Sequence, residues 1–69
     1  MREIIRKRLI EEIQASKLTT VQIGEKLGID PSNITQYKNT NKLPSLETFA
    51  KLCKIIGADA NYILGITDN

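Results

Sequence analysis

Histidine and tryptophan are absent from this sequence, and cysteine occurs once. A single cysteine cannot form a disulfide within one chain, and the lack of histidine removes both a Cys/His zinc site and the most common general base. The sequence also offers no phosphate-cradling glycine loop and no acid–nucleophile pair in a known motif. We therefore expect a protein that is not an enzyme and that uses no cofactor or metal.

Long apolar runs are also missing: none approaches the ~20 residues of a membrane span, and no signal peptide is evident. We therefore expect a cytoplasmic protein with no membrane partner. The 69 residues, 41% of them hydrophobic, fit one small globular domain over residues 1–69. The net charge of +2 permits a polyanionic partner without requiring one.

The stretch 19–39 predicts two short helices joined by a tight turn. Thr19 and Gln22 have the spacing of a capping box at the start of the first of these helices. Gly24 lies inside that helix at a cost of about 1 kcal/mol relative to alanine, which indicates that the following helix packs very close to it. Gly28 comes just after the helix, where a sharp turn needs a positive φ.

The second of these helices, residues 31–39, begins with a preferred N-cap and a proline at the first helical position, Asp30-Pro31. Ile34 and Tyr37 supply its buried edge. Its other side carries small uncharged polar residues instead of the usual Glu and Lys: Ser32, Asn33, Thr35, Gln36 and Asn39. Such side chains both donate and accept hydrogen bonds, which suits base edges in the major groove of DNA, where Gln and Asn can bind adenine. A neutral solvated face is the alternative.

Residues 1–17 predict another helix, with an apolar stripe at Ile5, Leu9 and Ile13 that Ile4 and Ile10 widen. Its first turns carry four basic residues, Arg2, Arg6, Lys7 and Arg8. This cluster is either a solvated helix face or a patch that approaches a phosphate backbone.

Thr40 to Pro44 is a polar loop in which we expect Asn41 to adopt the left-handed conformation that ends a helix. Lys38 and Lys42 lie beside the polar row, within reach of phosphates. Ser45 caps a fourth helix that ends at Gly57, with an apolar face at Leu46, Phe49, Ala50, Cys53 and Ile56. On that face Cys53 is a small core residue rather than a reactive thiol.

Asp59 caps a short fifth helix, residues 60–64, which ends at Gly65, and residues 66–69 form a stub. The last two helices supply more apolar surface than one core obviously needs, at Leu52, Ile55, Tyr62, Ile63 and Ile66. We expect most of it to be core and some of it to form a dimer contact.

These features resemble the Cro/C1-type (XRE-like) helix-turn-helix family of phage repressors and their relatives, over nearly the whole chain. The resemblance is carried by Leu18-Thr19, 23–29 (IGEKLGI), 32–34 (SNI), 44–48 (PSLET), 51–54 (KLCK) with Gly57, and 63–65 (ILG). It implies an all-α, five-helix lambda-repressor-like fold with the third helix in the major groove and the N-terminus of the second helix against a phosphate.

The resemblance also implies roles for individual residues. Ser32, Asn33 and Gln36 stand at base-reading positions, and the loop from Asn39 through Thr40 and Asn41 to Lys42 stands at the backbone-contacting position. Thr20 replaces a glutamine that the family often has near the DNA backbone. Further departures are Lys17 and Thr40 in place of glycines, and Pro31 in place of a polar reader, so base contacts should start one residue later.

The leading hypothesis is a DNA-binding transcriptional regulator, a repressor that binds a palindromic double-stranded operator as a homodimer through helices four and five. The alternative is a protein-interaction module, an antirepressor or adaptor, that kept the fold without specific DNA binding. Because the family's sequence often continues into a second domain, the chain is either a whole small repressor or the DNA-binding part of a longer one.

Overall fold

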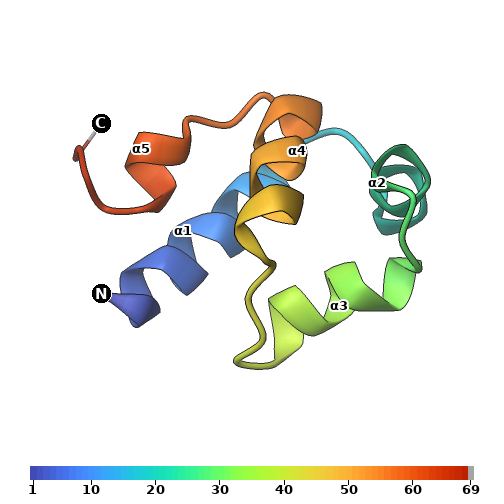
Figure 1. Ribbon diagram of the computed structural model, residues 1–69, viewed down its shortest axis with the longest axis horizontal. Helices are drawn as coiled ribbons and strands as arrows, with labels where there is room; N and C mark the ends of the chain where they lie inside the picture. The colour runs from blue at the N-terminus through green and yellow to red at the C-terminus, as the bar shows by residue number, and fades with distance from the viewer. Residues whose placement is uncertain (69) are drawn as a thin grey trace.

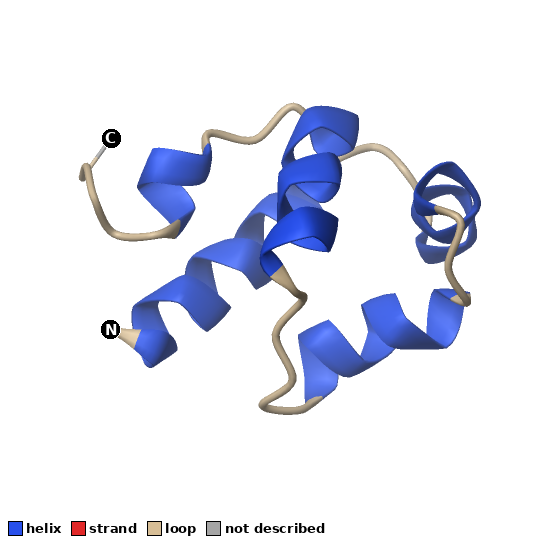
Figure 2. Cartoon of the chain, viewed as in Figure 1, coloured by secondary structure: helices blue, strands red, loops and turns tan. Residues whose placement is uncertain are grey.

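The computed structural model describes residues 1–68 and contains five α-helices connected by short loops (Figures 1 and 2). They are α1 (Arg2–Ala15), α2 (Thr20–Leu27), α3 (Pro31–Asn39), α4 (Leu46–Ile56) and α5 (Ala60–Ile63). No residue between 1 and 68 is in a strand, so the predicted all-α class with five helices is confirmed. Within the same residues, no helix has both the length and the apolar character to span a membrane.

One hydrophobic cluster draws side chains from all five helices. Its buried members are Leu9, Ile13, Ile23, Ile34, Tyr37, Phe49, Leu52, Cys53 and Ile63. Cys53 lies inside this cluster, and its burial, with smaller contributions from the charges of Asp59 and Glu12, raises the pKa of its thiol. A thiol that stays protonated in an apolar environment is a poor nucleophile, so the predicted core role of Cys53 is confirmed.

The buried face of α4 starts three residues later than the sequence suggested. Leu46 is 81% exposed and Ala50 is also exposed, so their predicted core roles are wrong. The same i, i+3, i+4, i+7 pattern instead begins at Phe49 and continues through Leu52, Cys53 and Ile56. Leu46 is the first residue of the helix, ahead of the turns that pack on the core.

α2 and α3 make the closest backbone approach in the motif. Gly28 ends α2 in the left-handed conformation with φ of 73°, as predicted, and α3 follows after a short turn (Figure 1). A Cβ atom added at Gly24 would lie 3.0 Å from the Ile29 carbonyl oxygen and 3.2 Å from Pro31 Cα and Cγ. The predicted close packing at Gly24 is therefore confirmed, and it is backbone that occupies the space.

Replacing Gly24 with alanine tests this contact. Alanine would gain about 1 kcal/mol of helix propensity, but a methyl group forced against rigid backbone costs about 1–3 kcal/mol. The two contributions together give a loss of up to about 2 kcal/mol, and because two of the three contacted atoms are backbone we expect Gly24→Ala to lower the free energy of unfolding by about 1 kcal/mol, measured by urea denaturation. Glu25→Ala, at an exposed neighbouring position, should stay within about 0.5 kcal/mol of the wild type. A Gly24→Ala protein as stable as the wild type would contradict the packing argument.

Candidate nucleic-acid interface

The N-terminus of α3 is fixed by its capping residue. The Asp30 side chain accepts a hydrogen bond of 2.8 Å from the Ser32 backbone N–H, and Pro31 occupies the first turn. Hydrogen bonds from the backbone and then the side chain of Ser32 hold the pKa of Asp30 below its ordinary value. Because the folded-state pKa is lowered, the contribution of this cap to stability is present at neutral pH and is lost as the pH falls through that lowered pKa.

The polar row of α3 faces away from the core. Ile34 and Tyr37 are buried on one side of the helix, as predicted. The other side exposes four residues of the predicted polar row, Ser32, Thr35, Gln36 and Asn39, and leaves Asn33 half-buried. The helix thus offers a strip of uncharged hydrogen-bonding groups to solvent, and their contact with bases remains a prediction.

The loop after α3 ends the helix without a left-handed residue. Thr40 is extended, and glycines are the only residues with positive φ between residues 1 and 68, so the expected left-handed Asn41 is wrong. The Thr40 hydroxyl donates to the Gln36 carbonyl oxygen at 2.7 Å and accepts from the Lys42 backbone N–H at 3.1 Å. These two hydrogen bonds tie the loop to the last turn of α3 without a left-handed residue.

Two arginines of α1 bind the C-terminal end of α3 through its backbone. Arg6 Nε donates to the Thr40 carbonyl oxygen at 2.6 Å, and a second Arg6 nitrogen lies 3.4 Å from the Lys38 carbonyl oxygen. Arg2 donates to the carbonyl oxygen of Asn41. Cations at a helix C-terminus interact favourably with its unpaired carbonyls. We call Arg2 and Arg6 the arginine clamp.

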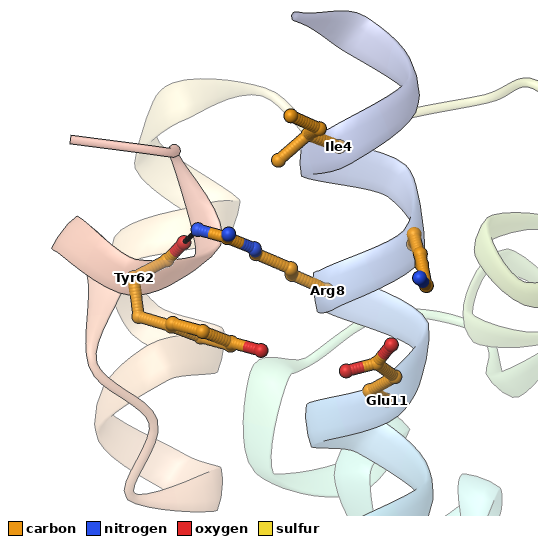
Figure 3. A pocket seen from close by; sticks show the side chains of 5 residues that line it. Ile4, Arg8, Glu11 and Tyr62 are labelled. Atoms are coloured by element: carbon orange, nitrogen blue, oxygen red, sulfur yellow. Dashed lines mark hydrogen bonds between the residues drawn. The ribbon is translucent and has the colours of Figure 1, made fainter. Parts of the chain in front are cut away.

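A third arginine ties α1 to the C-terminal segment. Arg8 extends from α1 to the backbone of α5 and donates to the Tyr62 carbonyl oxygen at 2.7 Å (Figure 3). It also donates to the Thr67 carbonyl oxygen at 3.1 Å, and its guanidinium lies 4.3 Å from the centre of the Tyr62 ring. The basic cluster of α1 is therefore not simply a solvated face. The residue types of the cluster carried a signal for this, because guanidinium groups suit several carbonyls at once. All three arginines donate to backbone carbonyl oxygens, whereas the one lysine of the cluster, Lys7, is exposed.

Of the remaining predicted site residues, Lys38 and Lys42 lie at the end of α3 and in the loop after it, and Thr20 lies on α2. Lys42 Nζ donates to Asn33 Oδ1 at 2.8 Å and to Gln36 Oε1 at 3.1 Å, so the structure brings these three residues together. Lys38 is half-buried and contacts the clamp through its carbonyl. Thr20 is half-buried at the first position of α2, directly after the capping box of Thr19 and Gln22, whose two hydrogen bonds are both present.

Comparison with known proteins identifies the family to which this chain belongs. Residues 9–63 match the family model described as Helix-turn-helix. The chain belongs to the helix-turn-helix family. It is 37% identical over 62 residues to a protein of Bacillus subtilis (strain 168) named "Uncharacterized HTH-type transcriptional regulator YobD". The alignment covers 90% of this chain and 55% of that relative, so the chain spans about half of the relative's length. No solved structure matches.

The arginine clamp predicts a specific stability defect. Hydrogen bonds to a charged group contribute about 1.5–3 kcal/mol when buried, and less when partly solvated as here. We expect Arg6→Ala to lower the free energy of unfolding by about 1 kcal/mol and to speed amide hydrogen exchange in the helix end and loop at residues 38–42. Lys7→Ala, on the exposed side of the same helix, should leave both unchanged within about 0.5 kcal/mol. Equal effects of the two substitutions would argue against the clamp.

Proposed function

We propose that this protein binds double-stranded DNA sequence-specifically as a transcriptional regulator, with α3 in the major groove. The observation that supports this most is the exposed uncharged polar strip of α3 on a helix whose other side is fully packed. A helix of this kind presents donors and acceptors to base edges without the desolvation cost of charged groups. Membership of the helix-turn-helix family and the similarity to a protein named as a transcriptional regulator agree with it.

The position of each polar residue on α3, α2 and the loop suggests which part of the DNA it contacts. Ser32, Thr35, Gln36 and Asn39 face the bases, because they are the exposed polar residues of α3. Lys38 and the loop residues Thr40 and Asn41 contact the phosphate backbone beside the groove, whereas the Lys42 ammonium lies on the polar strip itself. Thr20 at the N-terminus of α2 contacts a phosphate on the other side, where free backbone N–H groups favour an anion. Such phosphate contacts make binding strongly dependent on salt.

The small size of the protein supports binding as a homodimer on a palindromic operator. The longest dimension of the protein is 30 Å, and α3 has only nine residues, so one copy reaches a single stretch of groove. Two copies on half-sites about 34 Å apart would double the contacts. Ile66, after α5, is 68% exposed and offers an apolar contact for the second copy, whereas Leu52 and Ile63 are fully buried. Repression then needs no catalysis, since an occupied operator blocks polymerase.

The base-reading role of Gln36 is tested by substitution. We expect Gln36→Ala to reduce discrimination at one base-pair position by about 1–3 kcal/mol, measured by electrophoretic shift on sites selected from a random DNA pool. Gln14→Ala, an exposed glutamine on α1, is the matched control and should change neither affinity nor preference. Unchanged preference in Gln36→Ala would show that α3 is not the reading helix. No DNA binding at ~50 mM salt, together with a size shift on adding a partner protein, would favour the interaction-module alternative.

The dimer contact is tested at Ile66. Placing a carboxylate in an apolar contact leaves it desolvated, so Ile66→Asp should lower affinity for the full palindrome by at least about tenfold, or 1.4 kcal/mol. Affinity for an isolated half-site should change much less. Thr67→Asp, which adds the same charge at the next exposed residue, is the control. Equal losses on palindrome and half-site would exclude this surface as the dimer contact.

A further inference from the structure

Lys42 forms a bridge across the polar strip of α3. Its ammonium group lies 2.8 Å from Asn33 Oδ1 and 3.1 Å from Gln36 Oε1. An ammonium group only donates hydrogen bonds, so each amide must turn its oxygen toward it. The amide nitrogen of each residue therefore points away from Lys42.

The position of Lys42 is set by the rest of the fold. Its backbone N–H donates to the Thr40 hydroxyl, which in turn donates to the Gln36 carbonyl oxygen. The Thr40 carbonyl oxygen is held by Arg6 from α1, and the Lys42 ammonium lies 5.9 Å from the centre of the buried Tyr37 ring. The bridge is thus the end of a chain of contacts that begins on α1.

The two amides that Lys42 bridges, those of Asn33 and Gln36, differ in whether their NH₂ group is free to bind a further partner. Asn33 is half-buried, and its amide nitrogen donates to the Asp30 carbonyl oxygen at 3.2 Å, so both ends of this amide are engaged within the protein. Gln36 is exposed, and with its oxygen turned to Lys42 it presents its NH₂ group outward. Asn33 braces the bridge, and Gln36 is the residue that meets a base.

We propose that Lys42 is a specificity-determining positioning residue that makes Gln36 a hydrogen-bond donor and so selects guanine over adenine at the base that Gln36 reads. This inference rests on the proposed function. Guanine offers two acceptors in the major groove, N7 and O6, which suit the Gln36 NH₂ group and the remaining ammonium hydrogen. Adenine would direct its N6 amino group at Gln36 Oε1, to which the Lys42 ammonium already donates, so that this amino group meets a second donor with a positive charge.

The test is selection of binding sites from a random duplex pool by the wild type and by Lys42→Met, Lys42→Arg and Lys38→Met, followed by affinity measurements on the selected sites. The base-pair position at which Gln36→Ala loses its sequence preference is the position that Gln36 reads. At that position the wild type should prefer guanine over adenine by about tenfold, within the range of one bidentate contact. Lys42→Met should remove or reverse this preference, and Lys42→Arg, which keeps a donor-only group, should retain it.

Lys38→Met is the matched control, because Lys38 is the other lysine beside the polar strip, lies on the opposite edge of α3 from Asn33, and meets the clamp through its backbone. It should weaken binding to all sequences alike and reduce the salt dependence, as the loss of a phosphate contact does. The inference is overturned if Lys42→Met behaves in the same way with the base preference intact, or if the wild type already prefers adenine. A wild type without preference at any position would instead overturn the proposed function, and the inference with it.

Discussion

The contact of Gly24 with the backbone at Ile29 and Pro31 is the constraint on which the presentation of α3 depends. With hydrogen as its side chain, Gly24 lets the chain cross α2 at a distance that a methyl group would already fill. The left-handed Gly28 makes the turn sharp enough to bring α3 back to that point. Ile34 and Tyr37 then enter the core, and the 3.6-residue period turns the polar residues outward.

A nine-residue helix has little stability of its own, so both of its ends need support. At the start, Asp30 and the Gly24 contact supply it. At the other end, where α3 leaves the core, the arginine clamp from α1 holds the carbonyls of Lys38, Thr40 and Asn41. A helix fixed in this way at both ends would lose little freedom on binding the proposed DNA site, which favours both affinity and discrimination.

Features fixed by neighbouring residues could be predicted from the sequence. The capping box at Thr19, the Asp30-Pro31 start and the glycine ends are local, and each is present. The clamp was not predictable, because Arg6 and Thr40 are 34 residues apart, and an arginine that binds a backbone carbonyl leaves no pattern in the partner's side chain. The buried face of α4 was misplaced because periodicity gives the spacing of a stripe but not the turn at which packing begins.

For the candidate site, the sequence predicted which polar residues face outward but not which of them contact one another. Exposure of Ser32, Thr35, Gln36 and Asn39 followed from the helical period once Ile34 and Tyr37 were assigned to the core. The engagement of Asn33, by contrast, depends on Lys42, nine positions later, across a loop whose path is set by Thr40 and α1. An amide that the sequence predicts to read bases is thus hydrogen-bonded at both ends within the folded protein.

The clamp also bears on the electrostatics of binding. A backbone carbonyl carries no net charge, so Arg2 and Arg6 keep their full positive charge while they hold the loop after α3. With DNA docked as proposed, that loop lies beside a phosphate backbone, within the Debye length of about 10 Å over which such charges act. The two interpretations of the basic cluster on α1, as a structural element and as a source of attraction for phosphates, are therefore compatible. A chain of only +2 net charge can in this way keep positive potential beside the helix that we propose to read the bases.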